Sequence, residues 1–168
     1  MVRNAMTDWK QLVESAEGYL DLGMPDEASA ELDGMPSECL SKLELVWLRT
    51  EIYKQKRDWP MMRDFAEKLV KLCPEECNPW VWFASATRRS RSIMEAQVIL
   101  VDALKHHDSE PTIHFNLACY ACLAGDLPLA RERLARACLL EPKKHARALK
   151  DPDLEPLWAE LGKFKGGK

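Results

Sequence analysis

Residues 111–142 hold two helix-forming segments with a single turn between them. Residues 112–124 are apolar on nearly every side, whereas residues 128–140 carry apolar side chains on one face and arginines on the other. Gly125 supplies the positive φ that ends the first segment, and Asp126 opens the second. This pattern predicts a hairpin of two antiparallel helices.

The same arrangement recurs along the chain at intervals of 34 residues. The second helix has small or flexible residues at equivalent positions, Ala28, Met62, Ala96 and Ala130. The other equivalent positions are Ala16, Thr50, Ala84 and Ala118 in the first helix; Gly23, Arg57, Arg91 and Gly125 at the turn; and Leu32, Ala66, Leu100 and Leu134 four residues after the second-helix set. We therefore predict helix hairpins at about residues 9–40, 43–76, 77–110 and 111–144.

A 34-residue period with two helices in each unit resembles the tetratricopeptide repeat (TPR) family, in its bacterial type. The third and fourth repeats match it best, through Trp80, Phe83, Ala84, Ala96, Leu100 and Ala103, and through Leu117, Ala118, Gly125, Asp126, Ala130, Leu134, Ala137 and Pro142. Arg49 and Met62 depart from the leucine and alanine that are usual at their positions. The resemblance covers residues 9–142 and implies an all-α fold. It would be a right-handed superhelical solenoid of about four antiparallel helix hairpins.

The chain after the last repeat predicts a cap for its open apolar face. We expect a C-terminal capping helix within residues 145–162, with one face formed by Leu154, Leu157, Trp158 and Leu161. Residues 148–157 resemble tails that follow the last repeat in bacterial proteins of this family. Residues 163–168 are rich in glycine and lysine, which predicts a frayed end. Residues 1–168 are predicted to form a single domain.

Composition narrows the class of protein. The chain is 46% hydrophobic and 30% charged, which is typical of globular rather than disordered proteins. Its net charge of −3 argues against a dedicated nucleic-acid binder, although residues 85–168 carry 14 Lys and Arg against 11 Asp and Glu. No apolar run approaches about 18 residues, so we expect no membrane span. Residues 1–11 lack the apolar core of a secretory signal, and we expect a cytoplasmic location.

Candidate chemistry is sparse. The close cysteine pairs are Cys73 with Cys77 and Cys119 with Cys122, and the second pair falls inside a predicted helix. The four histidines stand at no zinc-ligand spacing, so we expect reduced core cysteines and neither a metal nor another cofactor. The usual signatures of hydrolases, zinc peptidases and nucleotide-binding loops are absent from the sequence, and we predict that the protein is not an enzyme.

The resemblance also implies a concave groove lined by fixed positions of each repeat's first helix. Transferred to this sequence, these positions predict a peptide-binding groove formed by Trp47, Glu51, Lys54, Asn78, Val81, Trp82, Ser85, Arg88, Arg89, Phe115, Asn116 and Cys119. Family members that bind chaperone tails hold the C-terminal carboxylate with basic residues. In the four repeats of this sequence, one of those clamp positions is occupied by Val13, Trp47, Val81 and Phe115 in turn. None of these residues is basic, so we expect no carboxylate clamp. The groove instead suits a peptide with two or three apolar anchors.

We therefore interpret the protein as a scaffold or chaperone-like adaptor that binds a protein or peptide. Packing between repeats also explains Trp47 and Trp82, and a solvated turn also explains residues 88–91. One alternative is a structural repeat protein that associates with itself as a homo-oligomer. Another, weakened by the net negative charge, is RNA contact through the basic residues Lys143, Lys144, His145, Arg147 and Lys150.

Overall fold

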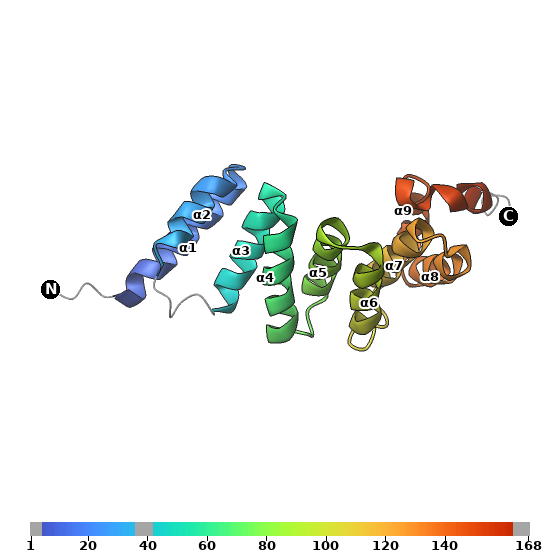
Figure 1. Ribbon diagram of the computed structural model, residues 1–168, viewed down its shortest axis with the longest axis horizontal. Coiled ribbons are helices and arrows are strands. Elements are labelled where there is room, and N and C mark those ends of the chain that lie inside the picture. The colour runs from blue at the N-terminus through green and yellow to red at the C-terminus, as the bar shows by residue number, and fades with distance from the viewer. Residues whose placement is uncertain (1–4, 36–41, 163–168) are drawn as a thin grey trace. The chain divides into compact units, whose positions relative to one another are not determined.

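The chain folds into helices that pack in sequential pairs. The structure, a computed structural model, describes residues 5–35 and 42–162, with side chains from residue 9 onward. It forms two compact units, Met1–Pro74 and Glu75–Lys168. Figure 1 shows the helices in chain order. The predicted frayed end, residues 163–168, lies outside the described residues.

The first unit contains two helix pairs. Helix α1 (Ala5–Asp21) packs on α2 (Pro25–Asp33), and α3 (Leu43–Lys56) packs on α4 (Trp59–Leu72). Helix α2 has only 9 residues against 14 in α4, and Gly34 is the residue at which it ends. A shared core joins α1, α2 and α3 through Trp9, Ala16, Leu20, Ala28, Leu32, Met35, Leu45, Leu48 and Ile52.

The second unit contains two more pairs and a C-terminal segment. Helix α5 (Cys77–Ser90) packs on α6 (Ile93–Ala103), and α7 (Pro111–Leu123) packs on α8 (Leu127–Leu140). Helix α7 also packs on α6 and on the segment that follows α8. These neighbours on several sides explain why its sequence is apolar nearly all round.

The 34-residue register is confirmed in the cores of both units. The twelve register residues outside the turn are all buried. So are the residues of a further register, Met35, Leu69, Ala103 and Ala137. Asp58, Ser92 and Asp126, also 34 residues apart, each accept a hydrogen bond from the backbone N–H three residues on. Each therefore caps the second helix of its hairpin.

Three of the four turn positions adopt the left-handed conformation. The φ angles are 72° at Gly23, 57° at Arg57 and 83° at Gly125. Arg91 departs from the register with a φ of −136°. Helix α5 therefore ends without the left-handed residue that follows the first helix of the other three pairs.

The C-terminal segment covers the last hairpin, but it is not one continuous helix. It comprises α9 (Lys143–Ala148), a 3₁₀ helix η2 (Pro152–Leu157) and the single turn α10 (Trp158–Leu161). Pro156 lies inside η2, where its missing N–H removes one backbone hydrogen bond. Among the described residues, no helix combines the length and apolar character needed to cross a membrane.

Candidate functional site

The predicted groove positions of α5 lie along one helical face. Asn78, Val81, Trp82, Ser85 and Arg89 recur at three- and four-residue steps, which places them on the same side of the helix. Asn78 and Arg89 are exposed, and the three others are half-buried. The Arg89 guanidinium donates hydrogen bonds to the hydroxyl and the carbonyl oxygen of Ser85. This face presents an aromatic and an aliphatic side chain beside a cation.

Arg88 connects α5 to the C-terminal segment. Its Nη1 and Nη2 donate to the two carboxylate oxygens of Asp153, at 2.5 and 3.2 Å. Its guanidinium also lies 5.4 Å from the centre of the Tyr120 ring on α7. Burial lowers the pKa of Arg88, but the hydrogen bonds and charge of Asp153 outweigh that effect and raise it. Arg88 is therefore engaged within the chain, in a bidentate pair of the stronger kind.

The predicted groove positions of α7 lie beneath the chain's own C-terminal segment. Phe115 is 0% exposed and Cys119 is 3% exposed. The Arg147 guanidinium stands 4.6 Å from the centre of the Phe115 ring, and Lys144 Nζ donates to Thr112 Oγ1 at 3.2 Å. Phe115 was expected to anchor a ligand, but in this structure it is a core residue that α9 covers. Asn116 remains half-buried.

The groove positions of the first unit lie on α3. Trp47, Glu51 and Lys54 share one helical face at four- and three-residue steps, and all three are half-buried. The Lys54 ammonium donates to both carboxylate oxygens of Glu51, at 2.7 and 2.8 Å. The two charges therefore neutralise each other on this face.

Cys119, Asp151 and Asp153 bring three potential metal-ligand atoms within 4.8 Å of one another. Asp153 is already paired with Arg88, and Asp151 Oδ1 accepts the Asp153 N–H at 3.2 Å. Burial raises the pKa of the Cys119 thiol, and the two aspartates add to the effect. The ion pair with Arg88 and the hydrogen bond between the two aspartates account for how these carboxylates lie together.

The other shifted acids are also held in their neutral forms. Burial raises the pKa of Cys77 to about 11, with smaller contributions from Glu110 and Glu76. Burial likewise raises the pKa of Tyr120 to about 12, against the opposing charges of Arg88 and Arg89. An activated cysteine nucleophile needs the opposite shift. These groups favour a packing role over catalysis.

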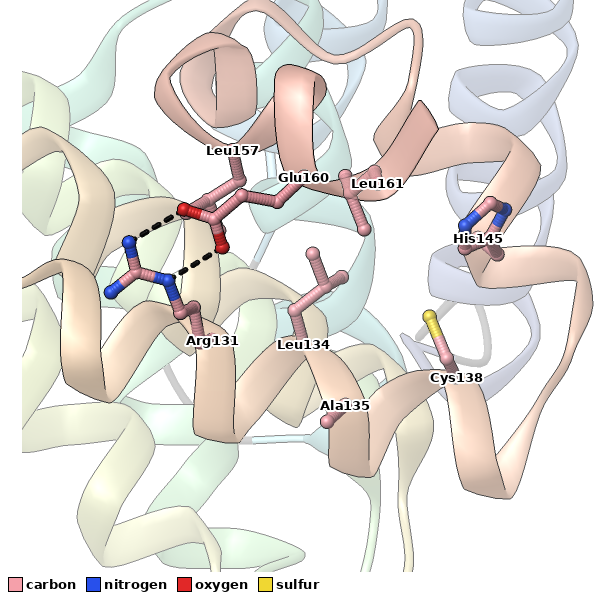
Figure 2. Close-up of a pocket in the computed structure, with 8 residues that line it drawn as sticks. All are labelled: Arg131, Leu134, Ala135, Cys138, His145, Leu157, Glu160 and Leu161. Carbon is pink, nitrogen blue, oxygen red and sulfur yellow. Dashed lines mark hydrogen bonds and ion pairs between the residues drawn. The ribbon is translucent and has the colours of Figure 1, made fainter. Parts of the chain in front are cut away.

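A cavity of about 380 Å³ lies between α8 and the C-terminal segment, and none of the predicted groove residues lines it. Figure 2 shows Arg131 and Glu160 paired at one end, with Cys138 and His145 at the other. The ion pair measures 2.6 Å, and Leu134, Leu157 and Leu161 line the space between the two ends. The buried Nε2 of His145 has no hydrogen-bond partner in the part of the chain described. The sequence predicted Leu134 as a repeat position and Leu157 and Leu161 as members of the cap, but it did not predict a cavity between them.

Comparison with known proteins identifies the fold. No family model matches the chain, and no curated protein sequence matches it. Among solved structures, it is similar to MamA MSR-1 C2 at 16% identity and a TM-score of 0.69, over 79% of this chain and 76% of that one. It is also similar to MamA RS-1 ArsTM double mutant, at 13% identity and a TM-score of 0.74, over 84% and 79%. The chain has a TPR-type fold. It is an all-α solenoid built from helix hairpins.

Proposed function

We propose that this chain is a non-catalytic repeat module that binds a segment of another protein, as a scaffold or adaptor. The observation that carries the proposal is the face of α5, where Val81 and Trp82 stay half-buried at the surface beside the exposed Arg89. Interfaces favour a tryptophan with an arginine nearby, because these side chains supply most hot spots. A cytoplasmic location is part of the proposal, supported by the free thiols of Cys73, Cys77, Cys119, Cys122 and Cys138.

The chemistry of this face favours apolar anchors over a terminal carboxylate. Val81 occupies a position that a carboxylate clamp fills with a basic residue. Each buried anchor of the partner contributes about 1.5–3 kcal/mol. A few anchors therefore reach micromolar affinity, which corresponds to about −8 kcal/mol. On the first unit, the face of Trp47, Glu51 and Lys54 is proposed as a second set of contacts.

The test compares capture of partners from native lysate by the wild type and by Trp82→Ala. The matched control is Leu139→Ala, because Leu139 is 73% exposed on α8 and lies outside both proposed binding surfaces. Loss of a hot-spot tryptophan costs about 2 kcal/mol or more. We expect the partner to be lost with Trp82→Ala and retained with Leu139→Ala, and calorimetry with the captured segment to show roughly a 30-fold weaker affinity. A folded Trp82→Ala protein that keeps the partner contradicts the proposal.

Self-association is the second candidate function, and a specific surface favours it. Met94, Val98 and Val101 form an exposed apolar stripe on α6, at 65%, 65% and 52% exposure. Light scattering across a concentration series tests it, with Val98→Lys as the disrupting variant. A mass of 19.2 kDa at every concentration would exclude this candidate.

A further inference from the structure

The C-terminal segment occupies the surface that repeat positions assign to a ligand. Leu154 and Leu157 of η2 are 0% and 1% exposed, and η2 packs mainly on α7. The Arg147 guanidinium lies over the Phe115 ring. The Asp153 carboxylate accepts hydrogen bonds from both Nη groups of Arg88. Two groove positions predicted from the sequence, Phe115 and Arg88, therefore contact residues of the same chain.

The segment presents its contacts in the manner of a short bound peptide. Asp151 caps η2 by accepting the Asp153 N–H at 3.2 Å, and Pro152 begins the 3₁₀ turn. In a 3₁₀ helix, residues three apart lie directly above one another, so Leu154 and Leu157 project on the same side. Trp158 Nε1 donates to the Ala148 carbonyl oxygen at 2.9 Å and closes the segment onto α9.

Charge complementarity supports recognition of this surface from outside the chain as well. Arg88 of α5 and the segment's own Arg147 and Lys144 lie over one face of α7. Asp153, directly before Leu154, pairs with Arg88 on this cationic side, while Leu154 and Leu157 are buried in the packing of η2 on α7 and α8. The recognised pattern is Asp-Leu-x-x-Leu in a 3₁₀ turn.

We infer that residues 151–157 act as an intramolecular stand-in for the partner, and that the partner competes with an acidic Asp-Leu-x-x-Leu segment of its own. This inference rests on the proposed function and names the partner's chemistry. Binding then requires η2 to leave the face of α7 while α5 and α7 stay folded. The segment is both a cap and a competitor of the ligand.

The probe is a fluorescent synthetic peptide of residues 148–161, added to the full chain. In the receptor chain, Asp153→Asn with Leu157→Ala weakens the resident segment and leaves α5 and α7 unchanged. We expect anisotropy to show at least tenfold tighter binding to this variant than to the wild type. A control peptide carrying Asp153→Lys is expected not to bind. If the folded variant binds neither peptide, or binds both equally, the inference is wrong.

Hydrogen exchange of the wild type provides a second measurement that needs no variant. We expect amides of residues 153–161 to exchange at least tenfold faster than those of α7, because the segment opens locally. Equal protection of the two regions would show that the segment does not leave, which overturns the inference. Either failure leaves the Trp82→Ala test of the proposed function unaffected, because Trp82 lies on α5.

Discussion

No atom of the Phe115 side chain reaches solvent, and the Arg147 guanidinium lies over its ring. Truncation of such a residue removes its burial and leaves a cavity, at a typical cost of about 3–5 kcal/mol. We therefore expect Phe115→Ala to lower the free energy of unfolding by about that amount, measured by urea denaturation.

The control for this prediction is Leu139→Ala. Leu139 is 73% exposed on α8, so its truncation is expected to change stability by less than about 0.5 kcal/mol. Equal effects of the two substitutions would contradict the core assignment of Phe115 and return it to the candidate groove.

Cys77 provides a pH-dependent prediction at the same scale. Its folded pKa of about 11 exceeds the ordinary 9.0, mainly because the thiol is buried. The neutral thiol therefore contributes stability fully below pH 9, and this contribution is lost as pH rises through about 11. At about pH 10 we expect roughly a tenth of native Cys77 to be thiolate, so that iodoacetamide modifies it slowly.

Mass spectrometry of the alkylated peptide measures this rate, with fragment ions separating Cys77 from Cys73. The same chain in urea is the reference, because its thiols titrate at their ordinary pKa. Native Cys77 that reacts as fast as the unfolded chain at about pH 8 would rule out the raised pKa.

At the scale of the element, the turn after α3 contains a strained backbone residue, Arg57, and a substitution to glycine would relieve this strain. Arg57 holds a φ of 57°, whereas Gly23 and Gly125 fill the equivalent positions of other repeats. A side chain in the left-handed region costs roughly 1–2 kcal/mol. We expect Arg57→Gly to raise the free energy of unfolding by up to about 1 kcal/mol, since the greater freedom of glycine in the unfolded chain offsets part of the gain.

Arg91→Gly is the matched comparison at the next repeat. Arg91 has a φ of −136°, outside the left-handed region, so glycine removes no left-handed cost there and loosens the unfolded chain. Thermal unfolding of both variants is expected to give shifts of opposite sign. A lower melting temperature for Arg57→Gly would show that the Arg57 side chain contributes more than its backbone costs.

The elements show how far local pattern determines structure. The 34-residue register predicted the helix pairs and the small residues at equivalent positions, and the local sequence predicted that Asp126 opens its helix, because all of these depend on neighbours within one repeat. The burial of Phe115 was not predictable in this way. It depends on residues 143–161, and the Arg88–Asp153 pair joins positions 65 residues apart in sequence. The sequence pattern predicted a cap within residues 145–162, but it did not predict that this cap would pack on α7.

At the scale of the whole molecule, the sequence predicts a single domain over residues 1–168, and the structure forms two compact units. Whether the two units unfold together as one domain stays a prediction. Repeat proteins contact mainly sequential neighbours, so their stability is close to a sum of local contributions. A substitution in one unit should then open that unit more than the other. Ile52 at 0% and Leu134 at 3% exposure are the core positions that test this.

We expect Ile52→Ala and Leu134→Ala each to cost about 2–5 kcal/mol. In hydrogen exchange, Ile52→Ala should accelerate the amides of α1–α4 at least about tenfold more than those of α7 and α8. Leu134→Ala should give the reverse pattern, so each variant is the control for the other. If both variants accelerate exchange equally throughout, the described chain opens as one cooperative domain. A partner bound to the second unit would then stabilise the first as well, since ligand binding shifts any opening that disrupts its site.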